Sequence, residues 1–344
     1  MRYSSILSAL ICALAGTPVA LAQNSPAYDP PKTSWGVPDV QGVYSTASLT
    51  TMTRPPGASG LIISVEERDK IFNKNIYTRV YKDESALSEA KLLTDANPDR
   101  AYNVFWMDPG ADLGKINGQY RSSWIVEPAN GQIPYIASPS GRGTRPSDAA
   151  AEEQFADLLS DNPEDRALPE RCVWMGFMGP GPVLGNALYN NNFQIVQTPD
   201  NVVILSEMAH DVRVIAINTT RNPASLPKWG GDSIGHYEGN SLVVETMNVM
   251  PRQNSFISEK GKVIERFTRM SDGRVLYQYT VEDPSKYTQP WKGEMPLNIS
   301  NGLYEYACHE GNYGMSNLLS GARAFEREGR KNGVRKQIFA GVPE

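Results

Sequence analysis

Hydrophobic and polar positions alternate with a period of two from residue 193 to residue 281, a pattern typical of antiparallel strands. Three pairs of such runs flank short turn sequences, so the pattern predicts three hairpins in series. The pairs are residues 193–197 with 202–208, 233–237 with 242–246, and 263–270 with 275–282, and a further run at 210–217 follows the first pair. Upstream, residues 123–127 and 132–136 flank Pro-Ala-Asn-Gly and predict a fourth hairpin.

A series of hairpins must close on itself or stack on a second sheet to protect its edge strands. We therefore predict a mainly β fold: an antiparallel up-and-down barrel or a strongly curved sheet, of the calycin or lipocalin kind, with a few peripheral helices. Such barrels carry a small apolar ligand in the mouth. A β-sandwich is the alternative architecture.

The rest of the chain predicts an extended arm and helical insertions around one β-rich domain. Residues 23–60 are rich in Pro, Ser and Thr and are expected to form an N-terminal arm, followed by a single domain over 61–344. Helical insertions are expected near 64–96, where Ser64 and Glu67 resemble a capping box, and near 147–159, where an apolar stripe lies between acidic residues. A terminal helix is expected after residue 311.

The first 22 residues have the pattern of a secretory signal peptide. Arg2 precedes an apolar run over 6–15, and Ala20-Leu21-Ala22 matches the small-x-small pattern of signal-peptidase sites. Thr17-Pro18 interrupts the run well short of the length that crosses a bilayer. We predict cleavage after Ala22 and export to the periplasm or the medium, with no membrane span in the mature chain.

The net charge of the chain argues against nucleic acids and anionic membranes as binding partners. The 344 residues include 33 basic and 38 acidic side chains, a formal charge of −5, without a long basic run. Nucleic acids and anionic membranes recruit basic surfaces, so neither is expected to bind. A hydrophobic small molecule is the expected partner, and the oligomeric state is left open.

Two cysteines remain after the leader, which contains Cys12. Because exported proteins meet an oxidising environment, we predict a disulfide between Cys172 and Cys308. Two inert buried thiols, or a thiol nucleophile beside His309, are the alternatives.

Candidate acid–base residues lie in two polar segments around His210 and His309, whereas His236 only precedes a hairpin turn. Histidine is the commonest proton-transfer group near neutral pH. Strand alternation places His210 on the face opposite Arg213, unless an irregularity near residues 209–210 re-aims one of them. We expect His210 or His309 to move the proton and Glu207 to orient or share it.

The remaining site expectations concern substrate contacts. Arg171 and Arg213 are expected to hold a carboxylate or a developing oxyanion, and the further binding residues are Asn191, Tyr306 and Trp291. Glu245, Glu265 and Glu282 either project into a polar lumen, beside an arginine, or lie on the wet face of their strands. Signatures of a serine hydrolase, a phosphate loop, a dinucleotide fold or a zinc helix are absent from the sequence, so we expect no cofactor and no metal.

Several motifs resemble those of a known family. They are ERC at 170–172, YNNNFQIVQ at 189–197, HDVR at 210–213, GNSLVVET at 239–246 and YEYACHEGNYGM at 304–315. They are similar to motifs of an exported, largely uncharacterised family of bacterial proteins, and the resemblance covers most of the mature chain. It implies a setting in the breakdown of hydrophobic or aromatic small molecules. The chain departs from the family at Gly235-His236-Tyr237, where Gly-Arg-Trp is expected, which argues against a shared role for His236.

Together these features favour an exported, cofactor-independent lyase of the decarboxylase or dehydratase type, acting on a hydrophobic, ring-containing small molecule. A lyase needs neither a redox centre nor an activated serine. The alternative is a carrier that binds such a molecule without changing it, and a second alternative is a hydrolase that uses Cys172 or Cys308.

Overall fold

The computed structural model describes residues 28–75, 78, 107–136, 162–250 and 256–328. The predicted signal peptide, residues 79–96 of the first predicted helical insertion and the whole of the second one at 147–159 lie outside the described residues.

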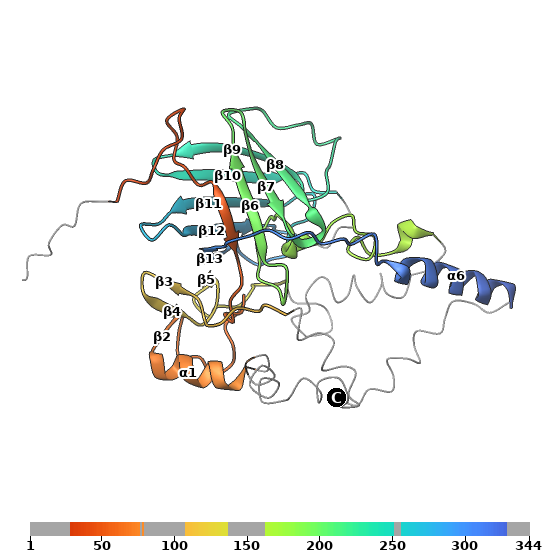
Figure 1. Ribbon diagram of the computed structural model, residues 1–344, viewed down its shortest axis with the longest axis horizontal. Helices are drawn as coiled ribbons and strands as arrows, with labels where there is room; N and C mark the ends of the chain where they lie inside the picture. Colours follow the sequence, from red (N-terminus) through yellow and green to blue (C-terminus); the bar gives the residue numbers. More distant parts are fainter. Residues whose placement is uncertain (1–27, 76–77, 79–106, 137–161, 251–255, 329–344) are drawn as a thin grey trace, which may run out of the picture.

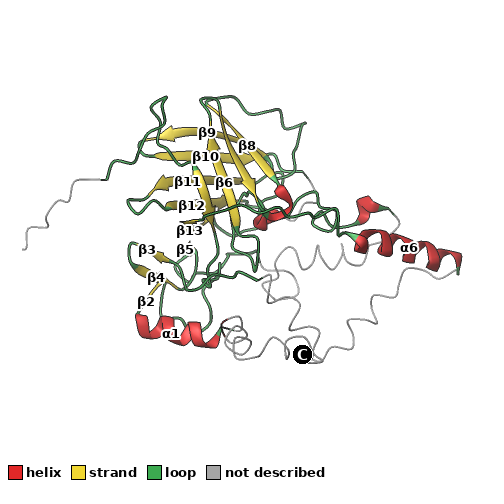
Figure 2. Ribbon diagram, viewed as in Figure 1, coloured by secondary structure: helices red, strands yellow, loops and turns green. Residues whose placement is uncertain are grey.

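A closed, mostly antiparallel barrel forms the body of the molecule (Figures 1 and 2). Its nine strands follow one another around the wall in the order β1, β6 to β13, and back to β1. Their bounds are β1 Gly42–Ser45, β6 Asn192–Gln197, β7 Asn201–Ser206, β8 Val212–Ile217, β9 Asp232–Glu238, β10 Ser241–Met247, β11 Lys262–Arg269, β12 Val275–Glu282 and β13 Trp291–Ile299. The predicted mainly β barrel with few helices is confirmed.

The three hairpins predicted in series are confirmed as β6–β7, β9–β10 and β11–β12, each within two residues of the expected bounds. They form because alternate side chains bury one face of each strand, as in β12, where every second residue from Val275 to Val281 is buried. One junction is not up-and-down: β8 and β9 pair in parallel, and only at Ala216–Ile234 and Ile217–Gly235.

The predicted fourth hairpin is wrong. Residues 125–127 form strand β5 (Ile125–Glu127), but β5 pairs with β13 rather than with residues 132–136. In that second segment Tyr135 instead forms an isolated bridge to Tyr287. β13 therefore divides one edge between two partners, with β5 opposite Lys292–Gly293 and β1 opposite Asn298–Ile299.

A small three-stranded sheet lies beside the barrel (Figure 1), with the order β2 (Ile62–Ile63), β4 (Gln119–Arg121) and β3 (Lys115–Ile116). Helix α1 (Val65–Lys74) follows β2, and the Ser64 hydroxyl accepts the Glu67 N–H at 3.2 Å, as the capping pattern predicts. Glu67 binds Ser59 instead of returning to Ser64, so only half of the capping box forms.

The N-terminal arm and the C-terminal segment each contribute one regular element. Within the predicted arm, residues 42–45 form β1 and complete the barrel wall. Helix α6 (Tyr313–Arg327) confirms the expected terminal helix, and Figure 1 shows it extending away from the barrel rather than along its wall. Among the described residues, no helix combines the length and apolar character needed to cross a membrane.

The inside of the barrel is packed rather than hollow. Aliphatic and aromatic side chains from every barrel strand except β9 belong to one buried cluster that includes Phe193, Phe267, Tyr277 and Trp291, and the partly buried Tyr237 of β9 packs against it. The segment 180–184 enters the same space, since Val183 and Leu184 belong to this cluster. In the part of the chain that the structure describes, this packed interior differs from that of barrels that carry a small apolar ligand in the mouth.

Candidate functional site at the barrel mouth

Most of the candidate chemistry gathers at one end of the barrel, which we call the mouth. Because neighbouring strands are antiparallel, the ends of β7, β10 and β12 meet the starts of β8, β11 and β13 there. The loop between β7 and β8, residues 207–211, forms part of this edge and is called the rim loop below.

The rim loop contains a backbone irregularity at residues 209–210, the place where the sequence pattern allowed for one. Its 3-10 turn η3 (Met208–His210) contains two consecutive residues, Ala209 and His210, with φ of 53° and 44°. Non-glycine residues in this left-handed region are uncommon and store backbone strain, which is often found at functional sites. The turn leaves the side chain of His210 exposed, although Met208 and Ala209 are buried.

Alternation begins at Val212, two residues later than the predicted run at 210–217, and from there it follows the predicted phase. Val212 and Val214 are 57% and 56% exposed on the outside of the barrel, while Arg213 is 6% exposed and points inward. His210 and Arg213 consequently lie on opposite sides of the wall and do not share one cavity.

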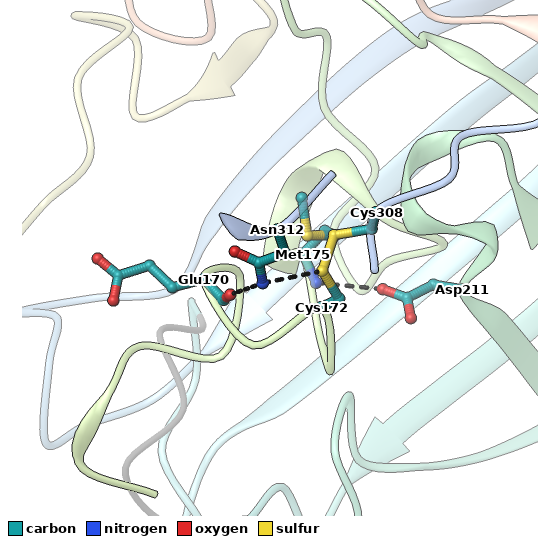
Figure 3. Close-up of a disulfide and its surroundings, with 6 residues drawn as sticks. All are labelled: Glu170, Cys172, Met175, Asp211, Cys308 and Asn312. Atoms are coloured by element: carbon teal, nitrogen blue, oxygen red, sulfur yellow. Dashed lines mark hydrogen bonds between the residues drawn. A yellow bond between two sulfur atoms is a disulfide. The ribbon is translucent and has the colours of Figure 1, made fainter. Parts of the chain in front are cut away.

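Asp211 is the acid–base candidate that strand periodicity missed. Its carboxylate accepts a hydrogen bond from the Met175 N–H at 3.1 Å (Figure 3). Burial raises the pKa of Asp211 from 3.8 to about 6, although the Met175 N–H and the positive charge of a protonated His210 oppose the rise. A carboxyl with a pKa close to neutral exchanges protons readily in the physiological range.

Glu207 opens the rim loop and is buried, with 4% of its surface exposed. It accepts hydrogen bonds from the side-chain amides of Asn190 and Asn192, at 2.6 and 2.7 Å, and from the Tyr304 N–H at 3.3 Å. Beside Asn190 and Asn192 lies a cavity of about 10 Å³, room for about one water. With three donors fixed on its carboxylate, Glu207 holds the loop in place rather than offering a free proton acceptor.

Arg213 lies beneath the mouth in a closed network with Glu265, which is fully buried. Its two terminal nitrogens bind both carboxylate oxygens of Glu265, and its Nε donates to Ser233 at 2.9 Å. The remaining N–H groups donate to Thr246 at 2.7 Å and to the carbonyl of Pro180 at 3.3 Å.

All five guanidinium N–H groups of Arg213 are therefore used. The expectation that Arg213 holds a substrate carboxylate is corrected: the network leaves it no free donor. Glu265 projects inward and pairs with an arginine, which is the first of the two alternatives given for it; it does not lie on the wet face of its strand.

Tyr277 completes this network, donating its hydroxyl to Glu265 at 2.7 Å and accepting the Leu184 N–H at 3.1 Å. Burial, followed by the charge of Glu265, raises the pKa of Tyr277 well above its ordinary value. Gly181 passes so close that a Cβ on it would lie 2.8 Å from an Arg213 nitrogen, and its φ is +84°. Only glycine fits at this crossing, which is why a Gly-Pro-rich segment enters the barrel.

Two other expected binding residues are structural. Asn191 is buried and ties its loop together, donating its amide to the carbonyls of Asp108 and Ala187 and accepting the Ala187 N–H. Trp291 has no exposed surface and packs edge-on against Tyr279, Tyr287 and Phe256 in the barrel core.

The predicted disulfide is present, with the sulfur atoms of Cys172 and Cys308 2.02 Å apart (Figure 3). It leaves no free thiol at either residue, so the hypothesis of a cysteine nucleophile loses its reactive group. Close to it, Tyr306 is half-buried and packs against the cluster of Met175, Met208 and Ala209.

Two candidates near the disulfide remain open to a ligand. Arg171 precedes Cys172, is half-buried, and its guanidinium binds no residue that the structure describes. His309 follows Cys308 and is exposed. By contrast, His236 lies outside the mouth, on the outer wall, and binds Glu238 at 2.8 Å.

Glu245 and Glu282 lie on the wet outer face of their strands, both within reach of Lys262. Within the described ranges, no three side chains of His, Cys, Asp and Glu gather closely enough to hold a metal ion. No protein-family model matches the chain, and a search of curated proteins found no match.

The raised pKa of Asp211 predicts a pH dependence of stability. Because the folded protein binds the Asp211 proton more tightly than the unfolded chain, this group stabilises the fold below about pH 4 and loses that effect as the pH rises through about 6. We expect the free energy of unfolding, measured with urea across this window, to fall less in Asp211→Asn than in the wild type. Parallel curves for the two proteins would contradict the assignment.

Proposed function

We propose that this protein is an exported, cofactor-independent lyase, of the decarboxylase or dehydratase type, that performs acid–base chemistry on a hydrophobic, ring-containing small molecule at the barrel mouth. The observation that carries the proposal is the His210–Asp211 pair. It joins an exposed imidazole to a carboxyl whose pKa is about 6, on a loop with two consecutive left-handed residues.

The two groups suit a dehydration. The Asp211 carboxylate removes a proton from a substrate carbon, and the His210 imidazole, as the general acid, gives a proton to the hydroxyl on the neighbouring carbon, which leaves as water. The substrate gains a double bond, Asp211 gains one proton and His210 loses one. Exchange with solvent restores both groups, so no redox partner is required.

Aromatic and basic side chains around the His210–Asp211 pair would bind the substrate. The aromatic side chains of Phe177, Tyr189 and Tyr304 are all more than a third exposed, and Tyr304 belongs to the segment bound to Glu207. Exposed rings of this kind stack on an aromatic ligand. Arg171 is the guanidinium we assign to a substrate carboxylate or oxyanion, in place of Arg213, and His309 is a second proton donor near the disulfide.

Export is proposed on two grounds. The leader-like first 22 residues predict it, and the Cys172–Cys308 disulfide supports it, because disulfides persist in oxidising compartments. Membership of the exported bacterial family is proposed on the motifs at 170–172, 210–213 and 304–315, which in the structure all lie around the disulfide and the rim loop.

The test is a mass-spectrometric screen of mixed aromatic acids and hydroxylated aromatic compounds incubated with the oxidised protein. We expect one compound to lose the mass of water or carbon dioxide, and His210→Ala to slow that loss. His236→Ala is the matched control, since His236 is also exposed but lies outside the mouth, and it should turn over as the wild type does. Compounds that are retained and recovered unchanged would instead identify a carrier.

A further inference from the structure

The rim loop is held from two directions by chain segments that are far apart in sequence. On one side, the Met175 N–H donates to the carboxylate of Asp211 at 3.1 Å. On the other, the Tyr304 N–H donates to the carboxylate of Glu207 at 3.3 Å. The two ends of a five-residue loop are thus each fixed through a carboxylate.

The disulfide joins these two holding segments. Cys172 lies three residues before Met175, and Cys308 lies four residues after Tyr304. Figure 3 shows the bond between the two segments, with Asp211 and the Met175 N–H beside it. The segments 172–175 and 304–308, closed by the disulfide, are called the clamp below.

Apolar packing completes the clamp. Met175 and Tyr306, one from each segment, pack with Met208 and with Ala209, the first of the two left-handed residues. A strained turn persists only when its surroundings hold it, so the clamp is the feature that maintains the backbone of the rim loop. It also covers Asp211, whose burial is the largest influence on its pKa.

We propose that the Cys172–Cys308 disulfide is a positioning element for the acid–base pair, which closes the clamp and sets the Asp211 carboxyl only in the oxidised protein. A dithiol reductant donates two electrons and two protons, so that the S–S bond breaks, two cysteine thiols form and the reductant becomes a disulfide. The protein would then keep its barrel but lose the geometry of the rim loop.

The direction of the change at Asp211 follows from its surroundings. The groups that face it are the imidazole of His210 on its own loop and the Met175 N–H on the clamp. Opening the clamp removes the Met175 N–H, which raises the pKa, and admits water, which lowers it. Because burial is the larger influence, the midpoint should fall from about 6 toward 3.8.

The test measures this titration without a substrate. Carboxyl ¹³C NMR of the wild type and of the Cys172→Ser/Cys308→Ser variant should show the Asp211 midpoint falling in the variant, with the resonance identified through Asp211→Asn. Asp272 is the control, since its carboxylate binds Arg274 in the β11–β12 turn and should titrate equally in both. An unchanged Asp211 midpoint would overturn the proposal.

Hydrogen–deuterium exchange of the wild type, with and without dithiothreitol, keeps the proposal testable if the variant fails to fold. We expect the amides of Met175 and the rim loop to exchange at least about tenfold faster after reduction, while those of β11 and β12 stay protected. Equal loss of protection in the barrel strands would show that the bond stabilises the whole domain, and it would contradict a local role.

The catalytic meaning of this inference rests on the proposed function, but its failure is distinguishable from failure of that function. The titration and the exchange measure the placement of Asp211, whereas the metabolite screen measures turnover. A protein that turns over no compound can still show the redox-dependent titration.

Discussion

Replacing Glu265 with glutamine is expected to destabilise the protein by about 3–5 kcal/mol, because it leaves the charge of Arg213 buried and unpaired. The five N–H groups of Arg213 converge on side chains fixed by three strands, β9, β10 and β11, and on the carbonyl of Pro180, so the guanidinium cannot turn toward water. Urea denaturation at neutral pH, with the disulfide intact, measures the loss.

The control for this prediction is Glu127→Gln. Glu127 pairs with Lys292 at 2.9 Å on the surface, where ion pairs contribute less than about 1 kcal/mol. A Glu265→Gln variant as stable as Glu127→Gln would contradict the prediction, because it would show that water reaches the charge of Arg213. Replacing both partners, as Arg213→Met with Glu265→Leu, should recover much of the loss, because the penalty comes from the unpaired charge rather than from lost volume.

Replacing Asp211 with asparagine is expected to lower kcat by about 10²- to 10⁴-fold on the compound that the screen identifies, which is the usual contribution of one general acid–base group. The acidic limb of the pH profile, with its midpoint near the Asp211 pKa of about 6, should disappear with it. Steady-state kinetics across this pH range give both results.

Stability separates this catalytic effect from misfolding. Because burial disfavours the charged form of Asp211, the asparagine variant should be at least as stable as the wild type at neutral pH. Asp272→Asn removes a carboxyl of the same type from a surface turn and should leave kcat unchanged. If the Asp211→Asn protein stays active, another group, such as His309, transfers the proton.

The barrel was predictable where its contacts are local. The β11–β12 hairpin joins adjacent runs of alternating residues through a short turn, so periodicity and turn composition were sufficient. β13 was not predicted, because Gly293 and Pro296 interrupt its pattern, although Trp291, Met295 and Leu297 are buried in alternation. The pairing of β5 with β13 joins residues far apart in sequence, which no local pattern encodes.

The candidate site was predictable in its residues more than in its roles. The motif at 210–213 was a candidate from its polar residues, and alternation gave the inward direction of Arg213. Its role depends on Glu265, 52 residues away, and on a carbonyl of the inserted segment, neither of which periodicity reveals. The pattern does not single out Asp211, because alternation alone starts the strand at residue 210, whereas the left-handed turn delays it to Val212.

The short parallel junction between β8 and β9 has a consequence for how the chain folds. Strands β6 to β8 and β9 to β13 each form from neighbouring hairpins, whose contacts close small loops and therefore form early. The two meanders pair directly at only two residue pairs of backbone, between β8 and β9, where the Arg213 side chain adds a bond to Ser233, while β1 bridges β6 and β13 on the other side. Joining these preformed halves into a cylinder is thus the late step of assembly, and the arginine that sequence reasoning assigned to substrate is the side chain that fastens it.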